Sequence, residues 1–336
     1  MVPTMRAIQV SAPGADFELV NRKIPVPKEN EVLIRVEACG ICRGDALAKE
    51  GHWPGIKYPI IPGHEVVGVV EAMGSQVTDR EIGQRVGVGW HGGHCFRCSA
   101  CRSGDFSACE HSLTTGISTD GGYAEYMAAR SEVLVSISDK LSPAETAPLL
   151  CAGRTTFGAL QNCGAKGGEL VAIHGLGGLG HLAVQYSVKL GYKTAILSRG
   201  REKEELAYKL GAHIYIDTNT TDAVKELRAL GAARVILCTA PNSKTISELI
   251  GGLSRNGKMI IVTGVWEPLR FSPSLLLGGS RSISGWVSGS IEEAVRFSML
   301  FGVVPVVEVF PLEQAALAFE KMMTSKVHFR AVLTMS

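Results

Sequence analysis

The glycine-rich run GLGGLG, residues 175–180, lies between an apolar segment and an amphipathic one. The segment ELVAIHG has the composition of a buried strand, and HLAVQYSVKLG has the apolar face of a helix that ends at Gly191. In this setting the glycines permit a tight turn, close approach of a pyrophosphate and packing of helix on strand. The helix N-terminus offers free N–H groups to the phosphates. The run therefore predicts a dinucleotide site, with a glycine turn that binds nothing as the alternative, and the expected cofactor contacts are Gly175, Leu176, Gly177, Gly178, Leu179 and Gly180.

The pattern of the chain changes near residue 150. Before it, short alternating segments such as EVLIRVEA are typical of half-buried strands separated by turns. After it, strands and helices alternate (TAIL, EKEELAYKLG, RVILC, KMIIV), which predicts a parallel, doubly wound sheet and an α/β fold class. At 336 residues the chain is long enough for two domains. We expect a β-rich domain over 1–152, a dinucleotide-binding domain over 153–288, and a C-terminal segment over 289–336 with one helix and one strand.

The residues after the strand TAIL indicate which dinucleotide binds. NAD sites usually place an acidic residue there, whereas this chain has Ser198, Arg199 and Arg201, with Lys203 just beyond. A hydroxyl can donate to a 2′-phosphate, and a guanidinium can pair with it. We therefore expect a preference for NADP(H), with NAD(H) possible. The alternative is that these are solvated charges at the start of a helix.

Four cysteines lie in the run CFRCSACRSGDFSAC, within a loop that spans about residues 90–111. Their spacing fits a tetrahedral zinc site better than disulfides or scattered buried thiols. Four protein thiolates leave no position for a substrate, so this zinc is expected to be structural, with ligands Cys95, Cys98, Cys101 and Cys109.

Composition excludes several classes of partner. Lys and Arg total 34 against 32 for Asp and Glu, which predicts neither a nucleic-acid interface nor an acidic membrane partner. No apolar run reaches the roughly 20 residues of a membrane span. The beginning of the chain lacks an apolar signal core. Nine cysteines without an export signal favour a reducing cytosol.

A second, open metal site can be assembled from residues far apart in the chain. Cys42 lies in CGICRGD, His64 and Glu65 in PGHE, and Cys151 in PLLCAG. Two thiolates and one imidazole would leave a fourth position for water or substrate, as catalytic zinc requires. Spacing alone does not join these residues, and each could instead be an ordinary core side chain.

The motifs CGICRGD, IIPGHEVVG, the four-cysteine loop, PLLCAG and GLGGLG occur in an order that resembles the zinc-dependent medium-chain alcohol dehydrogenases. The resemblance covers essentially the whole chain and is strongest to the branch of cinnamyl-alcohol-dehydrogenase-like enzymes and NADP-dependent aldehyde reductases. It implies a GroES-like catalytic domain, a Rossmann domain, and a return of residues 289–336 to the catalytic domain. It also implies an oxidoreductase with two zinc ions per chain that is a homodimer or homotetramer.

The resemblance also assigns roles to individual residues. It joins Cys42, His64 and Cys151 into one catalytic zinc site, with Glu65 beside the zinc and able to exchange with water. Asp45 matches a carboxylate that orients the histidine ligand. Further positions match a pyrophosphate contact at Arg43 and surroundings of the nicotinamide at Cys238, Thr239, Val262 and Gly264. Walls of the substrate pocket are matched at Trp53, Trp90 and His91, with plain packing as the alternative for these three.

One departure from the family concerns proton transfer. Two residues after the catalytic cysteine the family usually has a Ser or Thr that starts a proton relay, and this chain has Gly44. A histidine often found further along the relay is replaced by Leu47. We expect protons to leave by water, by a cofactor ribose hydroxyl, or through another side chain such as His52, which could also be a plain surface residue.

An aromatic, moderately apolar pocket favours primary alcohols and aldehydes, aromatic or medium-chain aliphatic, over charged or polyhydroxylated substrates. With NADP(H), aldehyde reduction is the expected direction. An NAD-dependent secondary-alcohol or polyol dehydrogenase shares every motif. A zinc-free quinone-reductase-like enzyme shares only the Rossmann half, and a non-catalytic NADP- and zinc-binding scaffold could retain the fold.

Overall fold

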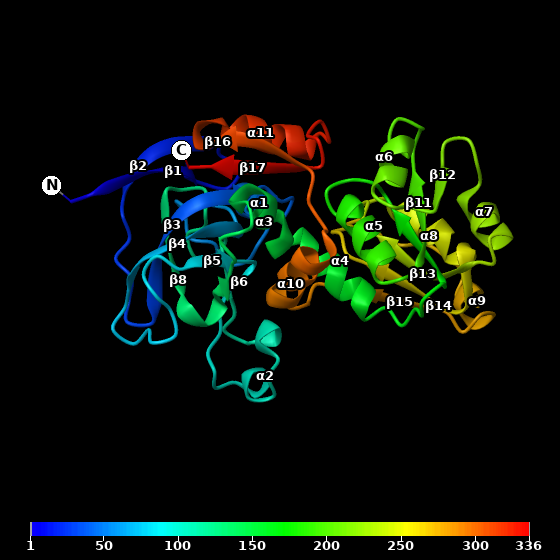
Figure 1. Ribbon diagram of the computed structural model, residues 1–336, viewed down its shortest axis with the longest axis horizontal. Coiled ribbons are helices and arrows are strands. Elements are labelled where there is room, and N and C mark those ends of the chain that lie inside the picture. Colours follow the sequence, from blue (N-terminus) through cyan, green and yellow to red (C-terminus); the bar gives the residue numbers. More distant parts are fainter. Residues whose placement is uncertain (1, 336) are drawn as a thin grey trace. The chain divides into compact units, whose positions relative to one another are not determined.

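The computed structural model describes residues 2–335, which form two compact units. Unit 1 consists of the chain up to Cys151 and from Pro305 onward, and unit 2 consists of Ala152–Val304. In Figure 1, unit 1 contains the blue and cyan strands together with the red C-terminal elements, and unit 2 contains the green to orange elements.

Unit 1 is built around a sheet of seven strands. The neighbouring strands are antiparallel except for the pair β16–β17, which is parallel. The order across the sheet is β16 (Val307–Pro311), β17 (Arg330–Thr334), β3 (Glu31–Gly40), β4 (Glu65–Met73), β5 (Arg85–Val88) and β9 (Val135–Ser136), and β8 (Tyr126–Arg130) also pairs with β3.

Smaller elements surround this sheet. Two antiparallel pairs are β1 (Thr4–Val10) with β2 (Phe17–Lys23) and β6 (His91–Gly93) with β7 (Leu113–Thr114). The helices are α1 (Asp45–Glu50), α2 (Ser99–Arg102), α3 (Pro143–Thr146) and α11 (Ala315–Met323), with short 3-10 turns η1 (Phe106–Ala108), η2 (Ser131–Val133), η3 (Ala147–Leu150) and η5 (Leu312–Gln314). The core combines apolar residues of β3 and β4 with Phe319 of α11 and Leu333 of β17. The last strand and helix are therefore part of the unit 1 core.

Unit 2 is a parallel six-stranded sheet with helices between its strands. The strand order is β12 (Ile214–Asp217), β11 (Lys193–Ser198), β10 (Leu170–His174), β13 (Ala233–Cys238), β14 (Leu253–Ile261) and β15 (Ser282–Gly285). The helices are α4 (Ala152–Gln161), α5 (Gly180–Lys189), α6 (Glu204–Lys209), α7 (Ala223–Ala229), α8 (Ser243–Leu249), α9 (Ser274–Leu277) and α10 (Ile291–Phe301), with the 3-10 turn η4 (Ile250–Gly252). The chain order reverses between β10 and β13, and ligands of such sheets bind at that point, beyond the carboxyl ends of the strands.

Local sequence accounts for several boundaries in unit 2. The Asp222 side chain accepts hydrogen bonds from the first free N–H groups of α7, and the Ser290 side chain does the same for α10. Helix α10 ends at Gly302, whose φ of 66° is a left-handed conformation that glycine adopts without strain. These caps hold the helices that cover the sheet.

The predicted α/β class, with a β-rich part and a parallel doubly wound part, is confirmed. The chain rejoins unit 1 at Pro305, whereas the sequence analysis placed the start of the C-terminal segment at residue 289. The difference is α10, whose residue Phe297 packs on Phe157 of α4 with ring centroids 4.8 Å apart. Helix α10 therefore belongs to unit 2.

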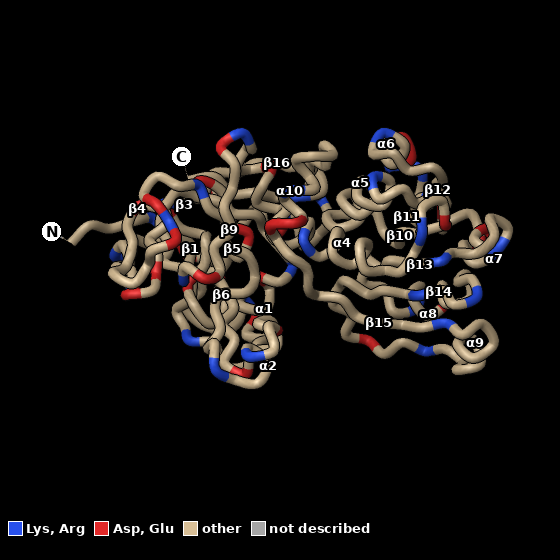
Figure 2. The backbone as a smooth tube through the Cα atoms, turned by 60° about the horizontal axis from the view of Figure 1, so that its bottom comes forward, with Lys and Arg blue, Asp and Glu red and all other residues tan. Residues whose placement is uncertain are grey.

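None of the helices in the described residues combines the length and the apolar character needed to cross a membrane. Basic and acidic residues are interspersed along both units (Figure 2).

Candidate metal and cofactor sites

Unit 1 brings together four side chains that can bind a metal. Cys42 follows β3, His64 and Glu65 lie where β4 begins, and Cys151 follows η3. One donor atom from each lies within 4.8 Å of all the others, and the two sulfur atoms are 3.9 Å apart. Sulfur ligands of a tetrahedral zinc ion lie about 3.8 Å apart when Zn–S is about 2.3 Å. The spacing of these donors therefore fits zinc.

The imidazole of His64 is oriented by Asp45. Its Nδ1 lies 2.9 Å from Asp45 Oδ1, and the ring is 1% exposed. A carboxylate accepts but does not donate, so the proton lies on Nδ1 and the Nε2 lone pair is free. Nε2 is buried and has no hydrogen-bond partner among the described residues. A buried nitrogen of this kind, beside two thiols, fits a metal ligand.

The charges of the cluster are strongly coupled. The hydrogen bond from Cys151 holds the pKa of Cys42 well below its usual range, helped by His64 and Arg330 and opposed by burial. That hydrogen bond and burial raise the pKa of Cys151. Burial alone would lower the pKa of His64, but Asp45 and Cys42 raise it well above its ordinary value. The donors therefore shift one another's pKa values, as ionisable groups that share one small buried site do.

Glu65 forms an ion pair with Arg330 of β17. The guanidinium donates to both carboxylate oxygens, at 2.6 Å to Oε2, and both side chains are almost fully buried. In the sheet, Gly40 of β3 is opposite Glu65 on one side and Val332 on the other. A methyl group on Gly40 would overlap the Glu65 carboxylate. The carboxylate thus crosses β3 over a glycine to reach the C-terminal strand.

Two tryptophans pack in series beside His64, Trp90 directly against it and Trp53 against Trp90. The Trp90 ring packs edge-on against His64 with centroids 4.7 Å apart, and Trp53 packs edge-on against Trp90 at 5.8 Å. A methyl group on Gly44 would lie 2.9 Å from Trp90 Cζ3 and 3.1 Å from His64 Cε1. The position where the family carries a relay hydroxyl is therefore filled by tryptophan.

The other residues that were predicted to surround this cluster have different neighbours. His91 Nε2 is 3.0 Å from His94 Nδ1, and the two rings are stacked. Arg43 and His52 are exposed, and Leu47 is partly buried in a small apolar cluster. Among the described residues, His52 is not one of the side chains whose donor atoms converge at this point, and its N–H donates to the Leu47 carbonyl at 3.0 Å. The structure thus brings Trp53 and Trp90 to the cluster and does not bring His91 or His52 to it.

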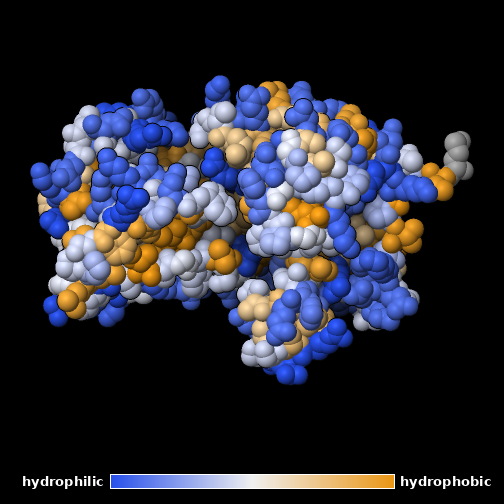
Figure 3. Space-filling model, turned by 180° about the vertical axis from the view of Figure 1, so that it is seen from behind, coloured by the Kyte–Doolittle hydropathy of each residue, from blue (hydrophilic) through white to orange (hydrophobic). Residues whose placement is uncertain are grey.

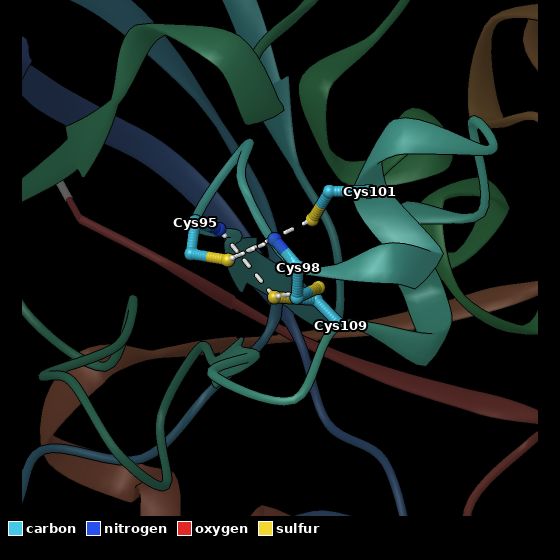
Figure 4. A group of neighbouring side chains, drawn as sticks. All are labelled: Cys95, Cys98, Cys101 and Cys109. Atoms are coloured by element: carbon cyan, nitrogen blue, oxygen red, sulfur yellow. Dashed lines mark hydrogen bonds between the residues drawn. The ribbon is translucent and has the colours of Figure 1, made fainter.

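The four-cysteine loop gathers its sulfur atoms at one point, as Figure 4 shows. The distance between sulfur atoms is 4.0 Å for Cys95 and Cys101 and 3.9 Å for Cys98 and Cys109, and all four lie within 4.8 Å of one another. Backbone N–H groups of Arg97 and Cys98 lower the pKa of Cys95 to about 6. All nine cysteines are free thiols, so the disulfide alternative is not observed.

The predicted glycine turn follows β10, at the place where the strand order of the unit 2 sheet reverses. Gly175 has a φ of 97°, which favours glycine, and a methyl group on Gly180 would overlap the Gly175 carbonyl oxygen. A methyl group on Gly177 would meet nothing within 4 Å, so the backbone there is open to a ligand. The Thr239 hydroxyl donates to the carbonyls of His174 and Gly175 at 2.9 and 3.0 Å. Thr239 therefore holds the turn in place.

The end of β11 carries the residues expected to select the cofactor. Ser198 is half-buried and Arg199 is exposed. Asp217 Oδ1 accepts a hydrogen bond from the Gly200 N–H at 2.8 Å, and the Tyr215 hydroxyl donates to the Gly200 carbonyl at 2.7 Å. These contacts fix the loop that follows Arg199.

The remaining residues predicted to contact the cofactor differ in their exposure and in their hydrogen bonds. Lys203 Nζ donates to the Leu176 carbonyl at 3.1 Å, which links it to the glycine turn. Val262 is half-buried and Gly264 is exposed after β14. The Cys238 side chain is instead fully buried in the unit 2 core. Its thiol is a packing group, and only its backbone reaches the strand end.

Sequence reasoning missed several residues that complete these sites. Tyr123 donates a hydrogen bond to Asp45 Oδ2 at 2.8 Å, Arg330 pairs with Glu65, and Asp217 fixes the loop after Arg199. The one available signal was the charge of Arg330, an arginine in the otherwise apolar strand FRAVLTM. A buried arginine requires an acidic partner. Nothing in the local sequence marks Tyr123.

Comparisons with known proteins agree with this geometry. The model of the alcohol dehydrogenase GroES-like domain matches residues 28–139, and that of the zinc-binding dehydrogenases matches residues 178–300. Alcohol dehydrogenase notN of Aspergillus sp. (strain MF297-2) is 45% identical over 325 residues, covering 96% of this chain and 95% of that protein.

Two solved structures extend the similarity to the fold. A cinnamyl alcohol dehydrogenase of Sorghum bicolor is 26% identical with a TM-score of 0.89, covering 99% of this chain and 98% of that one. CAD from Helicobacter pylori, complexed with NADP(H), is 25% identical with a TM-score of 0.87, covering 100% and 99%.

Proposed function

Because the chain belongs to the zinc-dependent medium-chain alcohol dehydrogenases, we propose that it transfers a hydride between NADP(H) and a primary alcohol or its aldehyde. The observation that carries this proposal is the convergence of Cys42, His64, Glu65 and Cys151 on one point of unit 1. Aromatic or medium-chain aliphatic aldehydes are the expected substrates. Reduction is the expected direction.

The donors fit a zinc ion with one position left for substrate. Cys42, His64 and Cys151 would hold the ion, and Glu65, held by Arg330, would stand beside it. A bound zinc ion would supply Lewis acidity toward a substrate oxygen at neutral pH. Asp45 keeps the Nε2 atom of His64 free for this role. Trp53 and Trp90 provide the apolar wall that favours an aromatic or aliphatic substrate.

Unit 2 supports the preference for NADP(H). The open backbone at Gly177 and the N-terminus of α5 would accept the pyrophosphate. Ser198 and Arg199 would bind the 2′-phosphate, with Lys203 close by. The cofactor would supply the hydride in the reductive direction.

Proton transfer in this chain cannot begin at position 44. Gly44 has no hydroxyl, and Trp90 fills the adjacent space. Water and the cofactor ribose hydroxyl remain as routes. We place no proton relay on His52.

We also propose that the four-cysteine loop binds a structural zinc ion. Its four sulfur atoms fit a closed tetrahedral site, which has no position for a substrate. Thiolate ligands require reduced cysteines, which favours a reducing compartment such as the cytosol.

Strand β15 supports a homodimer. It is the last strand of the unit 2 sheet, and its outer edge can pair with a second strand. Leu277 and Val287, which flank β15 in the chain, are each 83% exposed. Figure 3 shows apolar side chains gathered on unit 2. Val287→Asp should give a monomer in light scattering, whereas Val26→Asp, at a position 86% exposed in unit 1, should leave the dimer intact.

Zinc content and turnover together test the proposed function. We expect two zinc ions per chain and oxidation of NADPH with benzaldehyde, with kcat/KM at least tenfold higher for NADPH than for NADH. One zinc ion and no turnover would favour a non-catalytic scaffold. Faster turnover with NADH and a secondary alcohol or polyol would favour the alternative dehydrogenase.

A further inference from the structure

The phenol of Tyr123 lies on the far side of Asp45 from His64. Its hydroxyl donates to Asp45 Oδ2 at 2.8 Å, while Asp45 Oδ1 lies 2.9 Å from His64 Nδ1. The backbone N–H of Cys42 donates to the same Oδ2 at 2.9 Å. Tyr123 is 0% exposed and Asp45 is 2% exposed. The carboxylate is thus buried with three donors around it.

Each of these contacts has a physical reason. A buried carboxylate requires hydrogen-bond donors, since its charge is costly away from water. A buried tyrosine hydroxyl likewise requires a partner, and toward a carboxylate it can only donate. The Tyr123 hydroxyl therefore fixes the side-chain torsion of Asp45, because Oδ2 is held while Oδ1 faces the imidazole.

The ring of Tyr123 has a separate role. A methyl group on Gly63, the residue before His64, would overlap the Tyr123 ring, and Gly63 has a φ of 100°. The Tyr123 N–H donates to the Pro62 carbonyl at 3.0 Å. The ring and backbone thus support the segment that carries His64, whereas the hydroxyl acts on Asp45. Phenylalanine would keep the first role and remove the second.

We propose that Tyr123 is a positioning residue for the metal site of unit 1. Its hydroxyl holds Asp45 in the orientation that keeps the proton of His64 on Nδ1 and the Nε2 lone pair directed at the metal. This inference rests on the proposed function and deepens it, since it names a residue that sets metal affinity without touching metal, substrate or cofactor.

The test compares zinc retention in Tyr123→Phe and the wild type. Groups that orient a metal ligand, as Asp45 does, change metal affinity by about 10- to 100-fold. Tyr123 acts one step further out, so we expect the affinity for one of the two zinc ions, measured by competition with a chelator, to fall by about tenfold. Tyr186→Phe is the matched control, because it removes a fully buried hydroxyl that bonds Ser298 in unit 2. It should retain both zinc ions as the wild type does.

A double-mutant comparison separates positioning from packing. If Tyr123 acts through Asp45, Tyr123→Phe should have no further effect on zinc retention in an Asp45→Asn background. The absorption spectrum of the cobalt-substituted protein should also change in Tyr123→Phe and not in Tyr186→Phe. Unchanged zinc retention in Tyr123→Phe, or an equal effect in the Asp45→Asn background, would overturn the proposal. A wild type with a single zinc ion and no turnover would overturn the proposed function itself. Two zinc ions and turnover in the wild type, with unchanged zinc retention in Tyr123→Phe, would overturn only the role of Tyr123.

Discussion

Gly40 and Glu65 are opposite each other in the register of β3 and β4, and the Glu65 carboxylate occupies the space that a side chain on Gly40 would need. The carboxylate reaches Arg330 on the other side of β3 by this route. The metal cluster of unit 1 therefore depends on the absence of a single methyl group.

Gly40→Ala should displace Glu65 from Arg330. Overpacking and a broken buried ion pair together should lower the free energy of unfolding by about 3 kcal/mol. Denaturant unfolding would measure the loss, and kcat should fall with it. Gly285→Ala is the control, because a methyl group on this β15 glycine meets nothing within 4 Å. Equal stability of the two variants would contradict the geometry of Glu65.

Gly44→Thr should not create a proton relay. The backbone at Gly44 is right-handed helical, so the cost is steric and comes from Trp90 and His64. Overpacking should lower the free energy of unfolding by about 1–3 kcal/mol, and displacement of His64 should lower kcat/KM as well. Adding Trp90→Ala should recover part of that loss. Higher activity of Gly44→Thr alone would show that the site accommodates a relay hydroxyl.

Cys98→Ser and Cys42→Ser should have opposite phenotypes. Cys98→Ser removes one ligand of the four-cysteine loop and should lower the melting temperature, whereas Cys42→Ser should abolish turnover with little change in melting. Each should hold about one zinc ion per chain. Cys163→Ser, a buried thiol outside both clusters, should keep two. Exchanged phenotypes would reverse the assignment of the two sites.

Arg199→Ala should weaken selection of the 2′-phosphate. A charge-assisted hydrogen bond contributes about 1.5–3 kcal/mol, so kcat/KM for NADPH should fall by roughly 10- to 100-fold while that for NADH changes little. Steady-state kinetics with both cofactors would measure this. Arg255→Ala, at an exposed position on β14, serves as the control. A parallel fall for both cofactors would exclude a specific role for Arg199.

His174 should make stability depend on pH. Burial, together with the charge of Arg199, lowers the pKa of His174 to about 4, so the folded state keeps this ring neutral. Between the ordinary value near 6.5 and about 4, the unfolded chain binds a proton that the folded chain does not. The contribution of His174 to the free energy of unfolding is therefore fully present above about pH 6.5 and is lost as the pH falls toward 4.

The size of this effect can be measured by comparison with a variant. Between pH 7.5 and pH 5 the contribution of His174 should be about 2 kcal/mol. His174→Leu should lose stability less steeply over that range than the wild type. Denaturant unfolding at both pH values measures the difference, which cancels acid effects common to both proteins. Parallel declines would show that His174 does not remain neutral.

The parts of the sites that could be predicted from sequence are those whose geometry is local. The four cysteines lie within one loop, and GLGGLG is one turn between one strand and one helix, so spacing alone indicates their geometry. Cys42, His64 and Cys151 required the resemblance to a family, because their proximity depends on how β3, β4 and η3 pack. The misplaced boundary at residue 289 has the same origin, since α10 is assigned by its packing on α4.

The residues that sequence reasoning missed make contacts with segments far away in the chain. Tyr123 is 78 residues from Asp45, and Arg330 is 265 residues from Glu65. A shift of β17 by one residue against β3 would turn Arg330 to the other face of the sheet. Cys238 ends β13, where the sequence predicts a cofactor contact, and its side chain faces the core, so such a contact would be made by its backbone. Position along a strand does not determine which face a side chain occupies.

The pairing of β17 with β3 also has a consequence for biosynthesis. Unit 2 lies between β3 and β17 in the chain, so all of it is synthesised after β3 and before β17. Until β17 has been made, Glu65 lacks Arg330, and the edge of β3 from Ala38 to Gly40 lacks its partner strand. The core of unit 1 includes residues of α11 and β17, so we expect unit 1 to complete its folding only after unit 2 has been synthesised.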